Sequence, residues 1–396
     1  MTIGTIAWKY LCGRWLASAL TVFSVALGVS LVLATWLLTG GIREGFIAGT
    51  TDYNLIVGAK GSATQLVLNT IFRMDTPTPN ILYPVYARLQ EDARVDVAVP
   101  VALGDAYQGF RYVATTTAYF ASLPWRRKTF TVSTGRLWRD DPVTAPTYEA
   151  LLGADVAQQT GLEIGDRFYE GEEMAEYPLT VVGILRPTHS ADDQTIFFSL
   201  ASFWEMNELS RSTQVKPLTA VLVRPKRLSD LPSLHREFNG HEATQAVFPS
   251  AVLLNIFTVL SLVEEMFNYL LGMVMLVVLL YLFVSLYGAT LERKREIATM
   301  RALGARRATI LAIILLESCL ITLFGGVLGL LGGHGFAALG SYVLVQRGGW
   351  ALPPAPIGLL QPLVLVAVVL LGMAAGLLPA VLAYRTEVAE NLAPLS

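Results

Sequence analysis

Charged side chains are scarce in this chain of 396 residues. Asp, Glu, Lys and Arg make up 15% of it, against about a quarter in an ordinary soluble domain, and hydrophobic residues reach 53%. This composition excludes a disordered or collagen-like chain. The net charge of −2, without an extended basic surface, argues against a nucleic-acid partner.

Cysteine and histidine are also rare. The two cysteines, Cys12 and Cys319, lie in or beside hydrophobic segments, which excludes a disulfide-stapled fold. None of the four histidines has the spacing of a zinc site, and the sequence contains neither a G-x-S-x-G motif nor a P-loop. His189 with Asp192 and Asp193 is a weak candidate for a metal site, and a polar loop is the favoured interpretation. We therefore expect no catalytic residue, metal or cofactor in this chain.

Long apolar stretches are present instead. About 20 helical residues cross a bilayer, and four stretches are long enough. The second stretch is interrupted only by Glu264 and Glu265 near its start, and the third contains one acid, Glu317. The second is also long enough to project from the lipid as a stalk. The predicted transmembrane segments (TM1 to TM4) cover residues 15–38, 257–290, 308–340 and 359–382.

Lys and Arg residues in short flanking loops predict the orientation of these segments. Lys9 and Arg14 precede TM1, and six cations lie between TM2 and TM3, whereas the loop at 342–357 has only Arg347. We therefore expect the amphipathic segment 1–14, the loop at 291–307 and the tail at 383–396 in the cytoplasm. The apolar run of TM1 is too long for a typical cleaved signal peptide, so we expect it to remain as an anchor.

Residues 40–255 hold most of the charges and form a large insertion between TM1 and TM2. Short β-type runs, such as 96–101, 177–185, 195–198 and 219–223, alternate with helical ones. Residues 150–160 are predicted to form a helix. The fold class is therefore an α-helical membrane protein with four transmembrane helices and one large extracytoplasmic α+β domain, in one body or two lobes, inserted between TM1 and TM2.

The cytoplasmic loop at 291–307 has the most informative pattern. Ile297, Met300 and Leu303 recur at near-helical spacing, and Gly304 is placed to end a short helix in a left-handed cap. Such a helix would lie along the membrane and offer one face to a partner. A loop that merely fixes topology is the alternative, and composition alone leaves the two about even.

Two features lie inside the predicted membrane segments. Gly325, Gly329 and Gly333 occupy one face of TM3, which predicts close helix packing, either within one subunit or between two. Glu317 is costly in a bilayer unless it is paired, neutral or wet. A structural role is favoured over a proton or cation path.

The run from Glu292 to Ala305 closely resembles the coupling segment of MacB-like and FtsX-like (LolC/E-like) ABC transporter permeases. TM3, with its acid and glycines at 316–329, is similar to the third span of that family. Residues 378–392 resemble its closing motif, and the runs at 153–157, 165–166 and 181–185 resemble its extracytoplasmic core domain.

The resemblance implies a permease subunit in a bacterial inner membrane that transmits the conformational change of an ATPase to the extracytoplasmic domain (mechanotransmission). Efflux, lipoprotein or lipid release, or activation of a partner would follow. The implied partners are two copies of a cytoplasmic ABC ATPase, which would hold ATP and Mg, a second copy of this chain, membrane lipid and an extracytoplasmic protein. The residues expected to dock the ATPase are Glu292, Arg293, Arg295, Glu296, Met300, Arg301, Leu303 and Gly304. The alternative function is an ATP-independent scaffold or sensor, and an enzymatic domain is disfavoured.

Overall fold

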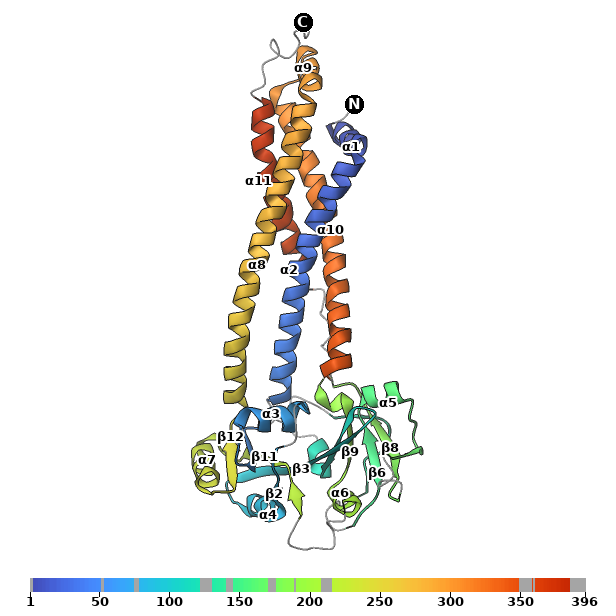
Figure 1. Ribbon diagram of the computed structural model, residues 1–396, viewed down its shortest axis with the longest axis vertical. Helices are drawn as coiled ribbons and strands as arrows, with labels where there is room; N and C mark the ends of the chain where they lie inside the picture. The colour runs from blue at the N-terminus through green and yellow to red at the C-terminus, as the bar shows by residue number, and fades with distance from the viewer. Residues whose placement is uncertain are drawn as a thin grey trace. The chain divides into compact units, whose positions relative to one another are not determined.

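The computed structural model divides into two compact units, a helical unit and a mixed unit (Figure 1). The helical unit comprises Met1–Gly40, Ser261–Gly340 and Pro354–Ser396, and the mixed unit comprises Gly41–Leu260 and Ser341–Pro353. The residues that the structure describes are 3–50, 53–74, 78–121, 130–139, 145–169, 176–188, 190–207, 216–348, 358 and 360–384.

Long helices dominate the helical unit. It contains α1 (Ile3–Gly13), α9 (Lys294–Ala302) and α11 (Leu360–Tyr384), and most of α2 (Trp15–Thr50), α8 (Pro249–Glu292) and α10 (Arg307–Gly348), whose remaining residues are counted in the mixed unit. Within the described residues, four helices, α2, α8, α10 and α11, are long and apolar enough to cross a membrane. They coincide with the four predicted apolar stretches. Helix α2 continues beyond residue 38 as far as Thr50, and no proline interrupts it.

Glycines let α10 lie directly against α2. A Cβ atom on Gly325, Gly329 or Gly333 would lie 2.6–2.8 Å from the Cβ atoms of Val25, Val29 and Leu33 respectively, which is closer than real Cβ contacts. Both series advance by four residues, so one face of α10 follows one face of α2 in parallel. The structure therefore assigns the glycine face to packing within one chain, because α2 occupies it.

The other contacts of α10 also use small residues. A Cβ atom on Gly376 of α11 would lie 2.8 Å from the Ser318 hydroxyl oxygen of α10, and one on Gly326 of α10 would lie 2.5 Å from Leu365 of α11. Helices that lack a hydrophobic driving force between them in lipid associate through such close contacts.

One sheet organises the mixed unit. Its strands are β1 (Leu55–Ala59), β3 (Val95–Tyr107), β4 (Phe110–Thr115), β5 (Val132–Gly135), β6 (Glu149–Leu152), β7 (Arg167–Phe168), β8 (Leu179–Leu185), β9 (Thr195–Ser199), β11 (Ala220–Pro225) and β12 (Thr244–Val247). Within the described residues they form a ten-stranded sheet of order β12-β1-β11-β3-β4-β9-β6-β8-β5, with β7 paired to β8. The pairs β4–β9 and β6–β8 are parallel, and the other strand pairs are antiparallel. A small second sheet pairs β2 (Ile81–Leu82) with β10 (Pro217–Leu218).

Both faces of this sheet are covered. Successive residues of β1 alternate, with Leu55 and Val57 in one apolar cluster and Ile56 in the other, as strand geometry requires. The first cluster includes side chains of α4 (Tyr83–Glu91), α5 (Ala154–Thr160), α6 (Leu200–Met206) and α7 (Leu231–Gly240), and the second includes those of α3 (Ala63–Phe72). The central strands are therefore buried on both sides.

The prediction of one helix over 150–160 was wrong for its first residues, which form a strand. Residues Glu149–Leu152 form β6, between β8 and β9, and α5 begins only at Ala154. Leu151 and Leu152 are fully buried on opposite faces of the sheet. After Glu149 every residue of this short strand is buried, so its sequence lacks the alternation that distinguishes a strand from a helix.

Arg94 joins the start of β3 to α7. Its guanidinium donates to Asp92 and to Glu237, each at 2.6 Å. Arg88 of α4 also contacts Glu237. The hydrogen bonds from Arg94 are the main reason that the pKa of Asp92 and that of Glu237 lie below their ordinary values.

We predict that Gly329→Ala lowers the free energy of unfolding by about 1–3 kcal/mol, because the added methyl group would overlap Val29 and the Ala26 carbonyl of α2. Gly335→Ala is the matched control. Gly335 has open space around its Cβ position, so alanine there should be neutral or stabilise by up to ~1 kcal/mol through helix propensity. Thermal unfolding in detergent measures both, and equal effects at the two positions would contradict the packing described above.

We predict that the mixed unit loses stability as the pH falls from about 5 to about 3. Asp92 and Glu237 have lower pKa values in the folded than in the unfolded chain, so their contribution is present above the unfolded values of about 3.9 and 4.3 and is lost as the pH falls through the folded ones. Arg94→Gln should remove about 1 kcal/mol at neutral pH and flatten this dependence.

Hydrogen–deuterium exchange of peptides from β3 and α7 measures the effect. Arg167→Gln, at an exposed arginine of β7, is the matched control and should retain the wild-type pH dependence. An unchanged pH profile in Arg94→Gln would show that this cluster does not stabilise the unit.

Candidate functional site

The segment between α8 and α10 folds as the short helix α9, Lys294–Ala302. Its C-terminus is closed by Gly304, whose φ is +96°, as the sequence predicted. The Gly304 and Ala305 amides donate to the carbonyls of Arg301 and Met300, each at 3.0 Å. Glycine takes this left-handed conformation without the steric cost that a Cβ atom imposes.

One face of α9 packs against the helical unit. Ile297 is buried and contacts Ile310 and Ile314 of α10 and Ala380 of α11, and Met300 lies at the edge of this cluster. Met300, which the sequence suggested as a docking residue, therefore contributes at least part of its surface to packing within the chain.

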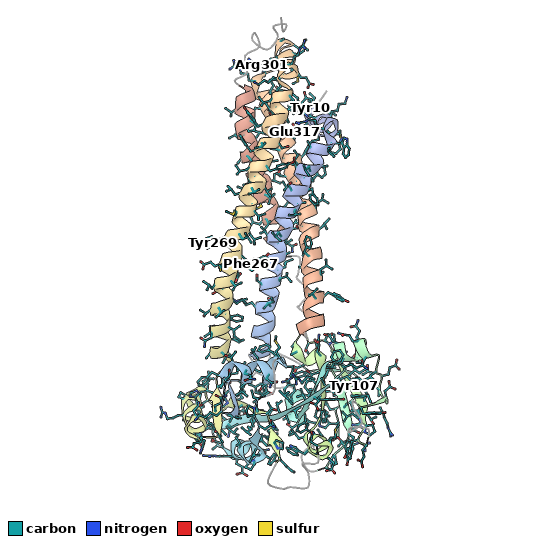
Figure 2. All side chains as sticks on the ribbon, in the orientation of Figure 1. Tyr10, Tyr107, Phe267, Tyr269, Arg301 and Glu317 are labelled. Atoms are coloured by element: carbon teal, nitrogen blue, oxygen red, sulfur yellow. The ribbon has the colours of Figure 1, made fainter. Side chains whose placement is uncertain are left out.

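Arg293 connects three elements at the junction of α8 and α9. Its guanidinium lies 3.2 Å from the Glu317 carboxylate of α10 and donates to the backbone carbonyl of Tyr10 in α1 at 3.0 Å. It also lies over the Tyr10 ring, 4.0 Å from the ring centroid. Figure 2 shows Tyr10 and Glu317 close together at this end of the helical unit.

The partner of Glu317 explains how an acid is tolerated within α10. Its side chain is 7% exposed and that of Arg293 is 12% exposed, so the pair lies largely out of water. Removing either charge would leave the other buried without a counter-ion, which is strongly destabilising. The structure thus gives Glu317 a structural contact, made to the Arg293 side chain.

A second ion pair lies near the junction of α8 and α9. Arg14, between α1 and α2, lies 3.1 Å from the carboxylate of Glu292 at the end of α8, but both side chains are partly exposed. Exposed pairs contribute little, typically below about 1 kcal/mol. Glu292 and Arg293, both expected to dock a partner, are therefore engaged in contacts within the chain.

The remaining predicted residues face outward to different degrees. Arg295, Glu296 and Gly304 are exposed, and Leu303 is 83% exposed. Arg301 is half-buried, and Figure 2 labels its place at the α9 end of the helical unit. An apolar side chain that protrudes beside charged ones is a feature of docking surfaces for a partner groove.

Glu296 also influences Tyr10. Burial is the main reason that the pKa of Tyr10 is raised, and the nearby carboxylate of Glu296 raises it further, while Arg293 acts in the opposite direction. The roles of Tyr10 and Arg14 were missed by sequence reasoning, which assigned α1 only to the membrane interface. The signal was an aromatic residue near a cation, but its partners lie 278 or more residues away along the chain.

The weak metal candidate is accounted for by hydrogen bonds. Asp193 accepts from the Thr188 amide and hydroxyl at 2.8 and 2.7 Å. Asp192 accepts from the Tyr119 hydroxyl at 2.8 Å and lies 3.6 Å from Arg73. His189 lies outside the described residues. Among those described, no three His, Cys, Asp or Glu side chains are grouped to hold a metal ion.

Two protein-family models match the chain. The MacB-like periplasmic core domain matches residues 18–239, more than half of the chain, and the FtsX-like permease C-terminal domain matches residues 268–388. The second match includes α9, the Arg293–Glu317 pair and the glycine face of α10.

Curated relatives match over shorter segments. The macrolide export ATP-binding/permease protein MacB of Chlorobium luteolum is 44% identical over 61 residues, which are 15% of this chain and 9% of that protein. The uncharacterized ABC transporter permease YvrN of Bacillus subtilis is 35% identical over 104 residues, which are 26% of this chain and 23% of that protein. The chain thus spans less than a quarter of either relative.

Among solved structures, the chain is similar to the periplasmic region of MacB from Actinobacillus actinomycetemcomitans. It has 11% sequence identity and a TM-score of 0.38, over 53% of this chain and 95% of that one. The extracellular domain of the transporter YknZ from Gram-positive bacteria has 15% identity and a TM-score of 0.33, over 49% and 100%. On the family models, which together cover most of its length, this membrane-embedded chain belongs to the MacB/FtsX-like family of ABC transporter permeases.

Proposed function

We propose that this chain is the permease subunit of an ATP-driven ABC transporter, in which α9 receives the movement of a cytoplasmic ATPase. The observation that carries the proposal is the attachment of α9. Ile297 holds its inner face against α10 and α11, and Arg293 ties its start to α1 and α10. A helix attached at both places moves with its neighbours rather than independently of them.

The proposed docking surface consists of the outward residues of α9 and its cap. Leu303, at the end of α9, supplies an exposed apolar anchor, and Arg295 and Glu296, in the first turn of the same helix, supply exposed charges of both signs. An apolar anchor with a polar rim is the usual composition of a protein interface. Gly304 fixes the position of Leu303 by ending the helix immediately after it.

Family membership supports a proposal for the full assembly. We propose two copies of this chain with two cytoplasmic ATPase subunits, which would bind ATP and Mg and carry out the hydrolysis. The chain would lie in a bacterial inner membrane, with its N- and C-termini in the cytoplasm and the mixed unit outside. The output would be conformational work on an extracytoplasmic substrate or partner, as in efflux, lipoprotein or lipid release, or partner activation.

An ATP-independent scaffold or sensor is the alternative function. Purification of the tagged chain from its native membrane distinguishes the two, because the first function predicts an ABC ATPase in near-stoichiometric amount and the second does not. Repeated absence of such an ATPase under mild detergent would favour the scaffold.

We predict that Arg295→Glu combined with Leu303→Asp abolishes recovery of the ATPase and lowers stimulated ATP hydrolysis at least tenfold, because it reverses a charge and removes the apolar anchor. Arg167→Glu, a charge reversal at an exposed arginine of β7 in the mixed unit, is the control and should preserve both. Membrane insertion and the unfolding temperature should be unchanged in all variants. Wild-type hydrolysis in the double variant would contradict the assignment of the docking surface.

We predict non-additive losses at Arg293 and Glu317. Arg293→Gln or Glu317→Gln alone should destabilise the helical unit by up to about 3–5 kcal/mol, because each disrupts a largely buried ion pair. The double variant should be at least 1 kcal/mol more stable than the sum of the single losses predicts. Thermal unfolding of the wild type, the two single variants and the double variant in detergent gives the double-mutant cycle. Strictly additive losses would show that the two side chains are not coupled.

A further inference from the structure

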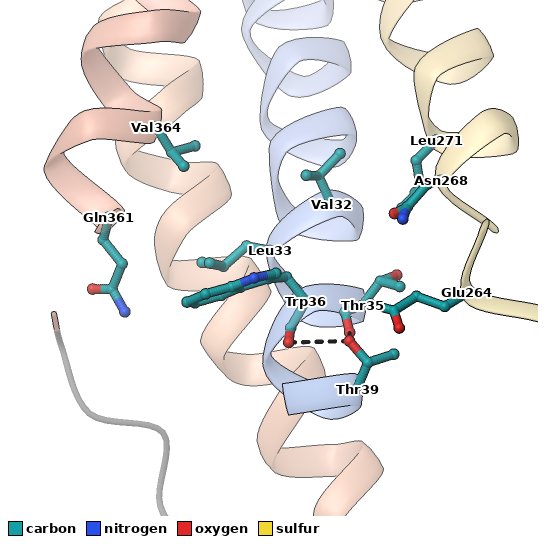
Figure 3. Close-up of a pocket in the computed structure, with 10 residues that line it drawn as sticks. All are labelled: Val32, Leu33, Thr35, Trp36, Thr39, Glu264, Asn268, Leu271, Gln361 and Val364. Atoms are coloured by element: carbon teal, nitrogen blue, oxygen red, sulfur yellow. Dashed lines mark hydrogen bonds between the residues drawn. The ribbon is translucent and has the colours of Figure 1, made fainter. Parts of the chain in front are cut away.

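A cavity of about 250 Å³ lies inside the helical unit (Figure 3). Its lining residues in α8, Glu264 to Leu271, lie far from Glu292, where α8 ends and α9 follows, so the cavity is at the end of the bundle opposite α9. Residues of α2, α8 and α11 line it. Small-molecule pockets usually have about 300–1,000 Å³, so this cavity holds part of a molecule, such as one segment of an acyl chain, rather than a whole drug-sized ligand.

The lining of the cavity changes from apolar to polar along the bundle. Val32 of α2, Leu271 of α8 and Val364 of α11 lie on the side nearer to α9. Each is followed, in the direction away from α9, by a polar residue of the same helix. These polar residues are Thr39, Glu264 and Gln361, and Figure 3 shows all three below their apolar counterparts.

The length of α8 indicates that the polar end of the cavity lies at a membrane interface. Glu264 precedes the last residue of α8, Glu292, by 28 residues, which is about 42 Å of helix. The hydrocarbon core of a bilayer is about 30 Å thick. If the α9 end of α8 lies near one interface, Glu264 therefore lies at or beyond the other. Trp36, which also lines the cavity and is 51% exposed, is a residue type enriched at that depth.

The polar end offers mainly acceptors. The Thr35 and Thr39 hydroxyls donate to carbonyls of their own helix, those of Leu31 and Thr35, each at 2.9 Å, and so present oxygen lone pairs to the cavity. The Glu264 carboxylate is half-buried and makes no hydrogen bond or ion pair with any other residue that the structure describes. A half-buried carboxylate at the interface is open to a cationic headgroup, because no described protein cation pairs with it.

We propose that this cavity binds an amphiphile with an apolar tail and a protonated amine headgroup. The tail lies among Val32, Leu271 and Val364, and the ammonium group donates to the Glu264 carboxylate. The Asn268 amide also lines the cavity, beside Leu271 (Figure 3). A cationic donor supplies the counter-charge that the protein side chains do not, and charge-assisted hydrogen bonds are the stronger ones.

Two sources can supply this chemistry. One is a bilayer lipid with a primary ammonium headgroup, and the other is a hydrophobic amine that enters from water. The site does not depend on ATP coupling, so it remains testable in the isolated chain whether or not α9 docks an ATPase.

Native mass spectrometry of the purified, delipidated full chain in detergent provides the test. The probes are phosphatidylethanolamine, phosphatidylglycerol with the same acyl chains, and dodecylamine. The wild type should bind phosphatidylethanolamine at least fivefold more tightly than phosphatidylglycerol. Glu264→Gln should lose that preference and weaken phosphatidylethanolamine binding about tenfold, which corresponds to one charge-assisted hydrogen bond.

Glu265→Gln is the matched control, because Glu265 is an exposed neighbour that does not line the cavity, and it should bind as the wild type does. Val364→Trp fills the apolar end and should weaken binding of both amine probes while the unfolding temperature is retained. If that variant unfolds early, the Glu264→Gln and Glu265→Gln pair still decides the outcome.

The probes also distinguish the sources. Binding of dodecylamine without phosphatidylethanolamine supports the site and identifies a water-borne amine as its ligand, whereas binding of both identifies the lipid as sufficient. Equal binding of phosphatidylethanolamine and phosphatidylglycerol together with undetectable dodecylamine binding would overturn the proposal. Equal effects of Glu264→Gln and Glu265→Gln would overturn it as well.

Discussion

The ion pair between Arg293 and Glu317 is the interaction on which the organisation of the helical unit most depends. Two charges that lie largely out of water are tolerated only if each satisfies the other, so the helices that carry them are held in one arrangement. Arg293 also accounts for the position of α1 through the Tyr10 carbonyl and ring. One side chain thereby sets the relation between the segment before α2, the start of α9 and α10.

The glycine face of α10 provides the complementary constraint. Gly325, Gly329 and Gly333 bring the α10 backbone against Val25, Val29 and Leu33 of α2, a distance that a side chain at any of these glycines would prevent. This close contact packs α2 tightly against α10. Any movement that reaches α10 through Ile297 or Arg293 would be shared with α2, which is what the proposed coupling requires.

The carboxylates of Glu317 and Glu264 have different surroundings in the bundle. Glu317 has a protein counter-charge and serves structure. Glu264 has none among the described residues and lies beside a cavity with a graded lining. An acid in an apolar segment can be of either kind. A carboxylate that has a protein counter-charge is structural, and one that has none and faces a cavity is available to a ligand.

The sequence by itself determined the four apolar helices, the large α+β insertion, a short helix within 291–307 ended by Gly304, and the family resemblance. Hydropathy, helical spacing and the preference of a left-handed cap for glycine are local properties, so they can be read without the tertiary structure. It did not separate β6 from α5, since a buried strand has no alternation. Only the tertiary structure decided that Arg293 and Glu292 contact their own chain and that the glycine face meets α2. It also decided that Glu264 opens onto a cavity. These outcomes depend on how each helix is rotated about its axis and on which residues, hundreds of positions apart, come into contact, and periodicity specifies neither.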